Sequence, residues 1–177
     1  QANHLKTQAQ WVTLCIAMLL ADKIVCLTRE FKEQIKAKIK IFYRDKKVLV
    51  IPNGIDLDLY KPKHNSAANV FYIGMQSRIV RIKDHTTLLK SFALIKKSGK
   101  IPAGYSIKLK IAGDGDFKGQ LIKLTGELEI NNDVEFTGML NEESLVQFLQ
   151  SLHLYVHASL GETMSTAVMQ AMGCGLP

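Results

Sequence analysis

The chain has 177 residues, of which 47% are hydrophobic and 22% are charged, and this composition excludes a disordered or a fibrous protein. Its net charge of +7 is typical of a protein that meets an anion, such as a phosphorylated ligand, a nucleic acid or an anionic membrane surface. The apolar run at residues 11–21 is shorter than the roughly 20 residues that cross a bilayer, which favours a core helix over a membrane span.

The three cysteines are odd in number and have no metal-binding spacing, which favours a reducing compartment. We therefore expect a cytoplasmic protein. The first residue is glutamine rather than methionine, so we also expect the sequence to be part of a longer chain.

The first 54 residues are predicted to alternate between helix and strand. Apolar residues at helical spacing predict a helix over residues 4–20. The run KIVCLT (23–28) predicts a buried strand, and Thr28 is a suitable N-cap for the lysine-rich helix that follows. The run KKVLVIPNG (46–54) predicts a second strand that ends in a Pro-Asn-Gly turn.

Residues 55–69 are polar and contain proline, so we interpret them as a linker between two domains. After them, strands are predicted at NVFYIGMQS, YSIKLKIAGDG, DVEFTG and LYVHAS, each followed by a predicted helix. Asp84 and Asn141 are suitable caps for two of these helices. Such alternation predicts an α/β fold with a doubly wound parallel sheet, whose ligands bind at the carboxyl ends of the strands.

Several short motifs have an ordinary structural interpretation. GDGDFKG spaces its glycines one residue too widely for a dinucleotide fingerprint, so we prefer a strand-to-helix turn. Two D-x-D patterns, at 56–58 and 114–116, lie in turn-rich segments. His153 and His157 would stand about 13 Å apart on a strand, too far to share a metal ion. We expect no metal site.

The basic stretch from Lys32 to Lys47 has aliphatic residues at helical spacing, such as Ile35 and Ile39. This pattern predicts an amphipathic helix with a solvated lysine face. The alternative that remains open is peripheral contact with an anionic membrane.

Two cations and one loop point toward a ligand at the sheet edge. Arg78 and Lys83 stand between a predicted strand and a predicted helix, where two cations suit a diphosphate. Glu162 precedes the last helix, where a carboxylate can favour the positive helix end or accept hydrogen bonds from sugar hydroxyls. The backbone amides of residues 163–165 are expected to be free for a phosphate or a hydroxyl, and Gln170 would face the same cleft.

Six segments in chain order resemble the retaining glycosyltransferases of family 4, which have the GT-B architecture of two Rossmann-like domains. These segments are ADKIVCLT, VIPNGIDLDLYKP, IGMQSRIVRIKDHTTLLKSF, LKIAGDGDFKGQL, DVEFTGML and LYVHASLGETMSTAVMQAMGCGLP. The resemblance implies that residues 1–54 end an acceptor-side domain and that 55–69 connect the domains. Residues 70–177 would then form a truncated nucleotide-sugar-binding domain.

The resemblance also implies a role for each matching residue. Arg78 and Lys83 would grip the donor diphosphate, and Glu162, the first acid of the family's E-x7-E motif, would contact the donor sugar. The remaining donor-binding residues would be Gly74, which would permit close approach, Phe136, Thr137 and Gly138 beside the nucleobase, and the amides of Thr163, Met164 and Ser165.

Two positions depart from the family pattern. Gln170 stands where the second glutamate of the motif, the ribose ligand, belongs. An amide can still bond both ribose hydroxyls, but the lost charge assistance costs about 1 kcal/mol. His153 stands where an aspartate is common.

The function that the resemblance implies is transfer of a sugar from a nucleotide-diphosphate donor to an acceptor hydroxyl with retained anomeric configuration. No cofactor or metal is expected, because cations and helix amides would stabilise the leaving diphosphate. Carbohydrate, lipid-linked and protein acceptors are all compatible, no nucleic acid partner is expected, and contact with the inner face of the membrane stays open.

Three other functions remain open at this point. They are a nucleotide-sugar epimerase of the same architecture, a non-catalytic nucleotide-sugar-binding protein, and, with the least support, a nicotinamide-dependent oxidoreductase. This stretch of sequence alone is expected to turn over nothing.

Overall fold

The computed structural model describes residues 8–63 and 69–177, which form two compact units. The first unit comprises the chain up to Gly54 together with Gly161–Ser165. The second unit comprises Ile55–Leu160 and Thr166–Pro177. Each unit buries its own hydrophobic side chains.

The first unit is a small helix and strand assembly. Its elements are α1 (Gln8–Leu20), β1 (Ile24–Cys26), α2 (Arg29–Ile39), the 3-10 turns η1 (Lys40–Phe42) and η2 (Asp45–Lys47), and β2 (Val48–Val50). β1 and β2 pair in parallel, and the Thr28 hydroxyl accepts a 3.1 Å hydrogen bond from the Phe31 amide as the predicted N-cap of α2. The predicted first helix is confirmed from residue 8 onward; its residues 4–7 lie outside the described part.

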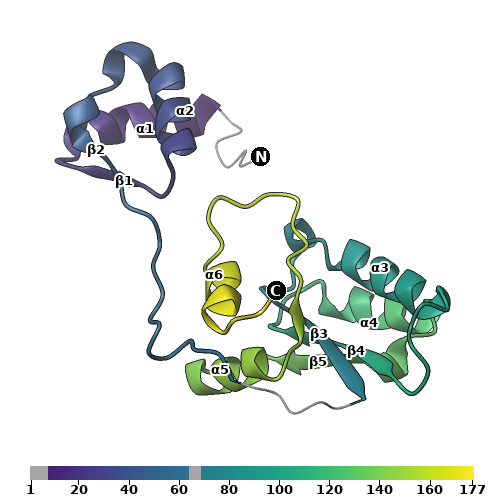
Figure 1. The fold of residues 1–177 in the computed structure, drawn as a ribbon. Coiled ribbons are helices and arrows are strands. Elements are labelled where there is room, and N and C mark those ends of the chain that lie inside the picture. Colours follow the sequence, from purple (N-terminus) through teal and green to yellow (C-terminus); the bar gives the residue numbers. More distant parts are fainter. Residues whose placement is uncertain (1–7, 64–68) are drawn as a thin grey trace. The chain divides into compact units, whose positions relative to one another are not determined.

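The second unit carries a four-stranded sheet with helices between the strands (Figure 1). Its strands are β3 (Val70–Gln76), β4 (Ser106–Ala112), β5 (Val134–Gly138) and β6 (Leu154–Tyr155), in the order β5-β4-β3-β6 and all parallel. Its helices are α3 (His85–Lys97), α4 (Lys118–Glu127), α5 (Glu142–Gln150) and α6 (Thr166–Gly173), with 3-10 turns η3 (Arg81–Lys83) and η4 (Asn131–Asp133). The predicted α/β parallel sheet is therefore confirmed.

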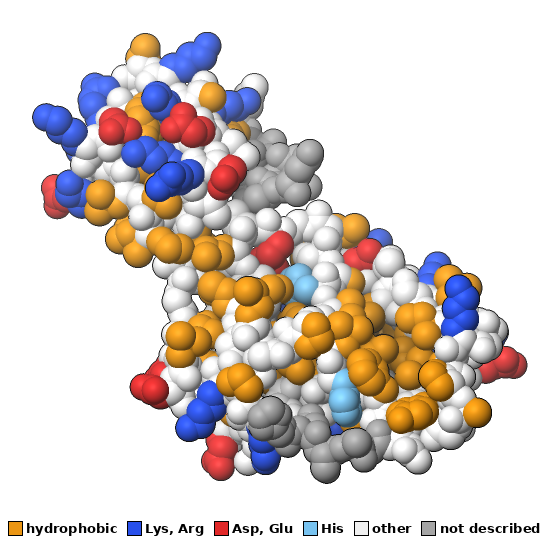
Figure 2. All heavy atoms as spheres, in the orientation of Figure 1, with side chains coloured by type: hydrophobic (Ala, Val, Ile, Leu, Met, Phe, Trp, Pro, Cys, Tyr) orange, Lys and Arg blue, Asp and Glu red, His pale blue; other side chains and the backbone are white. Residues whose placement is uncertain are grey.

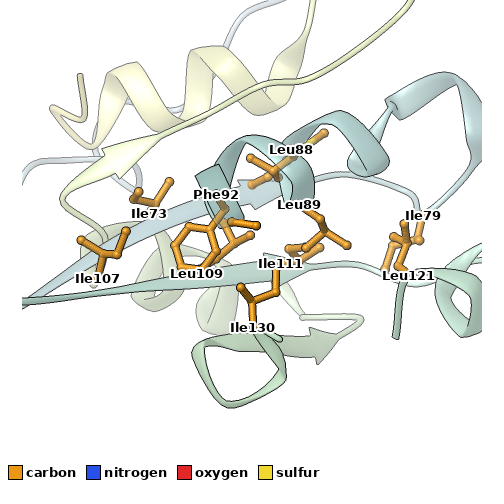
Figure 3. Close-up of a cluster of buried hydrophobic side chains, with 12 residues drawn as sticks. Ile73, Ile79, Leu88, Leu89, Phe92, Ile107, Leu109, Ile111, Leu121 and Ile130 are labelled. Carbon is orange, nitrogen blue, oxygen red and sulfur yellow. The ribbon is translucent and has the colours of Figure 1, made fainter. Parts of the chain in front are cut away.

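Helices cover both faces of this sheet. On one face, buried side chains of α3 and α4 pack on β3 and β4, and Figure 3 shows them pointing toward one another. On the other face, α5 and α6 pack with Tyr60, Tyr72 and Tyr155. Both predicted caps form: the Asp84 carboxylate accepts from the Thr87 amide, and the Asn141 side chain accepts from the Ser144 amide.

The segment that follows Gly54 differs from the predicted linker. Residues 55–63 belong to the second unit, where Tyr60 is only 4% exposed. A Cβ on Gly173 of α6 would lie 3.0 Å from the Tyr60 carbonyl oxygen, so the helix and this segment are in close backbone contact. Residues 64–68 of the predicted linker lie outside the described part.

The last strand is shorter than predicted. Only Leu154–Tyr155 pair with β3, although LYVHAS had the composition of a full strand. Past Val156 the chain leaves the ladder, and the Leu160 amide instead donates to the carbonyl oxygen of Ile82. Across residues 8–63 and 69–177, no helix is both long and apolar enough to cross a bilayer.

Candidate functional site

The strand order changes direction at β3. Strands β4 and β5 lie on one side of it, and β6 lies on the other. In doubly wound sheets, ligands bind at such a switch point, outside the carboxyl ends of the strands. The loop that follows β3 carries Arg78 and Lys83, so the sheet topology puts these two cations at the switch point.

The loop after β3 is held by backbone contacts with the turn after β4. The Ser77 amide donates to the Ala112 carbonyl (3.0 Å), and the Ile79 amide donates to the Asp114 carbonyl (2.8 Å). Gly113 has φ +126°, and a Cβ there would overlap the Ser77 carbonyl oxygen. Gly113 and Gly115 of GDGDFKG thus let two loops approach each other, as the turn interpretation predicts.

Arg78 is exposed, and no ion pair to its guanidinium forms within the described residues. Two acidic side chains of the adjoining segments are already engaged. Asp84 caps α3, and Asp114 bonds the Gly115 amide and Lys118. Those two bonds hold the pKa of the Asp114 carboxyl below its usual value. The Arg78 charge is therefore available to an external anion.

A buried histidine is hydrogen-bonded to the same loop. His85 is completely buried, and its Nε2 lies 3.0 Å from the Ser77 hydroxyl, which also donates to the Arg78 carbonyl. Its Nδ1 has no hydrogen-bond partner within the described residues. Burial is the main cause that lowers the pKa of His85 to about 4, so the ring is neutral at pH 7.

Three side chains form a chain of hydrogen bonds beside the end of β3. The Gln76 amide nitrogen donates to the Gln170 oxygen (2.9 Å), and the Gln170 nitrogen donates to the Tyr60 hydroxyl (2.7 Å). The Tyr155 hydroxyl donates to the backbone oxygen of Gln76 (3.2 Å). Gln170 is therefore bonded to the last residue of β3, and both ends of its amide already have a protein partner. Its predicted contact with the ribose remains a prediction.

A hollow of about 200 Å³ opens at the carboxyl ends of β3 and β4. One side carries polar and charged groups, and the other side is apolar. Its lining residues are Gln76, Ser77, Arg78, Ala112, Gly113, Met139, Leu140 and Leu145. Sequence reasoning identified only Arg78 among these as a binding residue, because the apolar ones have the pattern of ordinary core residues.

The predicted nucleobase residues lie next to this hollow rather than around it. Phe136 packs against the core below the sheet. The Thr137 hydroxyl lies 3.5 Å from the Ile111 carbonyl oxygen, and the Gly138 carbonyl accepts from the Gly113 amide. The apolar wall comes from Met139 and Leu140, one and two residues farther along the chain.

Gly74 makes room for a neighbouring side chain in the core. It is a buried residue in the middle of β3, and a Cβ there would overlap the Leu152 side chain. The close approach that it permits is that of a neighbouring side chain in the core. Its role in permitting close approach of a ligand remains a prediction.

The segment Gly161–Ser165 belongs to the first unit, whereas Arg78, Lys83 and Gln170 belong to the second. Within the first unit, the Asn53 side chain donates to the Met164 carbonyl (3.3 Å). Helix α6 begins at Thr166, so Thr163, Met164 and Ser165 precede it rather than open it. The donor-binding roles of Glu162 and of these three amides remain predictions.

The motifs that were expected to be structural are engaged in contacts within the protein. The Asp56 carboxylate accepts from the Asp58 amide, which closes a turn, and His153 Nδ1 accepts from the Tyr72 amide (3.0 Å). In the part of the chain that the structure describes, no cluster of three or more metal-ligating side chains is present.

Comparison with known proteins identifies the family. The family model of the "Glycosyl transferases group 1" matches residues 56–177. EpsF of Bacillus subtilis is 30% identical over 141 residues, which are 74% of this chain and 35% of that protein. The alpha-monoglucosyldiacylglycerol synthase of Streptococcus pneumoniae is 26% identical over 171 residues, which are 88% of this chain and 36% of that protein.

Solved structures have the same fold. TarM superposes with a TM-score of 0.80 at 18% identity, over 99% of this chain and 33% of its own length. Anabaena HepE, solved with UDP-glucose, superposes with a TM-score of 0.75 at 21% identity, over 99% of this chain and 49% of its own. The chain spans about a third of the length of the curated relatives that it matches. By its sequence, the chain belongs to the group 1 glycosyl transferases.

Proposed function

We propose that the protein transfers a sugar from a nucleoside-diphosphate sugar to an acceptor hydroxyl, and that the second unit binds the donor. The observation that carries this proposal is the unneutralised Arg78 on a pinned loop beside the hollow. A diphosphate supplies the matching anion, and a nucleoside supplies polar edges and apolar faces for the hollow. HepE was solved with UDP-glucose, which supports a donor of this class.

The proposed chemistry needs charge stabilisation of the leaving diphosphate. Arg78 and Lys83, on one loop, would supply it through charge-assisted hydrogen bonds as the sugar departs. Glu162 would contact the donor sugar, and retention of the anomeric configuration and independence from metal ions complete the proposal. Family membership supports each of these assignments, and the switch-point position of the two cations supports the first.

We further propose contact between the first unit and an anionic membrane. Residues 29–47 contain eight Lys or Arg against three Asp or Glu. Within this stretch, the turn η1 leaves Ile41 80% exposed and Phe42 40% exposed. Figure 2 shows Lys and Arg side chains gathered on the unit that carries α1 and α2. Exposed apolar side chains in a cation-rich segment are suited to insertion between anionic headgroups. A cytoplasmic location and a lipid-linked acceptor would fit this contact.

The transfer proposal is tested by product analysis. The full-length protein is incubated with UDP-, GDP- and ADP-sugars and an acceptor mixture, and the anomeric configuration of any product is read by NMR with and without EDTA. We expect one donor to be consumed, the configuration to be retained and EDTA to have no effect. Interconversion of the donor sugar without transfer would instead establish an epimerase, and nucleotide binding without turnover would establish a non-catalytic protein.

A further inference from the structure

Gln76 lines the hollow and has an unpaired polar atom. It is the last residue of β3, and its amide nitrogen is bonded to Gln170. Its Oε1 is buried and has no hydrogen-bond partner within the residues that the structure describes. A buried acceptor without a donor is a costly arrangement, which a ligand that brings a donor would relieve.

The amide network does not remove this unpaired atom. Gln170 lies between Gln76 and the Tyr60 hydroxyl, and its two ends bond one of them each. If both glutamine amides were rotated by half a turn, the unpaired oxygen of Gln76 would only be exchanged for an unpaired NH₂. One end of the Gln76 amide therefore lacks a protein partner in either arrangement.

The surroundings of Gln76 define what kind of ligand group would meet it. It shares the hollow with Arg78 and with an apolar wall of Met139, Leu140 and Leu145. A diphosphate bound to Arg78 would leave the nucleoside half of the ligand over the rest of the hollow. Ribose hydroxyls and base N–H groups are the hydrogen-bond donors that a nucleoside carries.

We propose that Gln76 is a ligand-binding residue that accepts a hydrogen bond from the nucleoside half of the donor, and that Gln170 positions it. This inference rests on the proposed function. It assigns to Gln170 a second contact, through Gln76, in addition to any direct contact with the ribose. Both side chains lie in the second unit, so the pair needs no contribution from the first.

The test separates the nucleoside half of the ligand from its diphosphate half. Dissociation constants for UDP, GDP and ADP and for inorganic pyrophosphate are measured on the full-length protein and on Gln76→Leu. We expect the variant to bind the preferred nucleotide about three- to tenfold more weakly and pyrophosphate unchanged. Gln147→Leu, at an exposed glutamine of α5, is the matched control and should change neither constant.

Nucleotide analogues identify the donor group without relying on the folding of a variant. On the unsubstituted protein, the 2′,3′-dideoxy nucleotide and the nucleotide with a methylated base N–H are compared with the parent compound. We expect one of them to bind about three- to tenfold more weakly, and Gln76→Leu to show no such difference for that analogue. A loss with the dideoxy compound assigns the ribose, and a loss with the methylated base assigns the nucleobase.

The outcomes that overturn the proposal are distinct from those that overturn the function. If nucleotides bind but Gln76→Leu binds them equally well, or if neither analogue loses affinity, the role of Gln76 is wrong and the proposed function stands. If Gln76→Leu weakens pyrophosphate as much as nucleotide, the substitution acts through the Arg78 loop, and the proposal is again wrong. If the unsubstituted protein binds no nucleotide, both fail.

Discussion

At the scale of single residues, Gln170 retains half of its hydrogen-bonding capacity. A glutamine amide offers two donors and two acceptor positions, and Tyr60 and Gln76 take one of each. The remaining N–H and lone pair are the minimum that a ribose diol requires. If Gln170 binds the ribose as proposed, we therefore expect the departure from the family motif to weaken nucleotide binding without abolishing it.

Restoring the motif should strengthen nucleotide binding. In Gln170→Glu, the carboxylate can accept from both the Gln76 amide and the Tyr60 hydroxyl and still receive two ribose hydroxyls with charge assistance. We expect the affinity for the preferred nucleotide to rise by about 1 kcal/mol, or roughly fivefold, measured by isothermal titration. Gln147→Glu adds the same charge at an exposed site and should change nothing. Weaker binding by Gln170→Glu would contradict this account.

His85 makes stability depend on pH. Its pKa in the folded protein is about 4, whereas an unfolded histidine titrates near 6.5. Between these pH values His85 is protonated in the unfolded chain but neutral in the folded chain. The contribution of neutral His85 to the free energy of unfolding is therefore full above pH 6.5 and is lost as the pH falls toward 4. Over that window His85 should remove up to about 3 kcal/mol of the free energy of unfolding.

The measurement is denaturant unfolding at several values of pH between 4 and 7. His85→Gln cannot titrate and can still bond the Ser77 hydroxyl, so its stability should vary less across this window than that of the unsubstituted protein. An unchanged slope in the variant would show that the pH dependence has another origin.

At the scale of elements, the contact between the β3 and β4 loops depends on Gly113. An alanine there would have a positive φ and would overlap the Ser77 carbonyl. We expect Gly113→Ala to lower the free energy of unfolding by at least about 2 kcal/mol, measured by denaturant unfolding. The matched control is Gly119→Ala in α4, where a Cβ meets nothing within 4 Å and should stabilise the helix by about 0.5 kcal/mol. Equal stability of the two variants would contradict the role of Gly113.

The elements themselves were largely predictable from local signals. Thr28, Asp84 and Asn141 begin their helices as caps, because a short polar side chain followed by an apolar helical pattern is a local signal. Side-chain burial was less predictable. In α3, apolar residues recur at Leu88, Phe92 and Ile95 with helical spacing, yet Ile95 is 46% exposed. The buried residues of α3 are instead spaced four apart, as in Leu88 and Phe92 or Leu89 and Ala93. Which side of the helix is buried depends on how it packs against the sheet, and the helix sequence alone does not determine this.

Tertiary contacts explain the errors at the ends of elements. Residues 55–63 look like a linker because they are polar and contain proline, yet Tyr60 is buried under α6. LYVHAS looks like a full strand, yet the chain leaves the sheet to bond the loop that carries Lys83. Both errors concern partners more than 75 residues distant, which no local pattern can reveal.

At the scale of the whole molecule, contacts between residues far apart in the sequence also limited what could be predicted of the site. Arg78 and Lys83 were identified because a cation that follows a strand and precedes a helix is a local signal with a known position in a parallel sheet. Gln76 was not predicted as a binding residue, because the hydrogen bond that orients its amide is made with Gln170, which is 94 residues away in the sequence. His85 was missed because its sequence position is that of an ordinary helix start.

The charge distribution of the molecule predicts where a membrane would touch it. The excess of cations in residues 29–47 flanks the exposed Ile41 and Phe42 in the sequence. We expect the full-length protein to co-sediment with vesicles of anionic lipid, but not with neutral vesicles, and to be released by salt. An Ile41→Ser, Phe42→Ser double variant should lose much of this binding, whereas Leu57→Ser, at an exposed leucine of the second unit, should not. Equal binding to neutral vesicles would contradict the electrostatic part of the proposal.

The most direct test of the central claim is titration of the full-length protein with UDP, GDP and ADP, beside Arg78→Ala with Lys83→Ala. Arg81→Ala is the control, because Arg81 is on the same loop but its guanidinium lies over the Phe117 ring. We expect one nucleotide to bind, the double variant to lose at least about tenfold in affinity and the control to lose nothing. Binding that is equally strong in the double variant, or no binding of any nucleotide, would contradict a donor site at the end of β3.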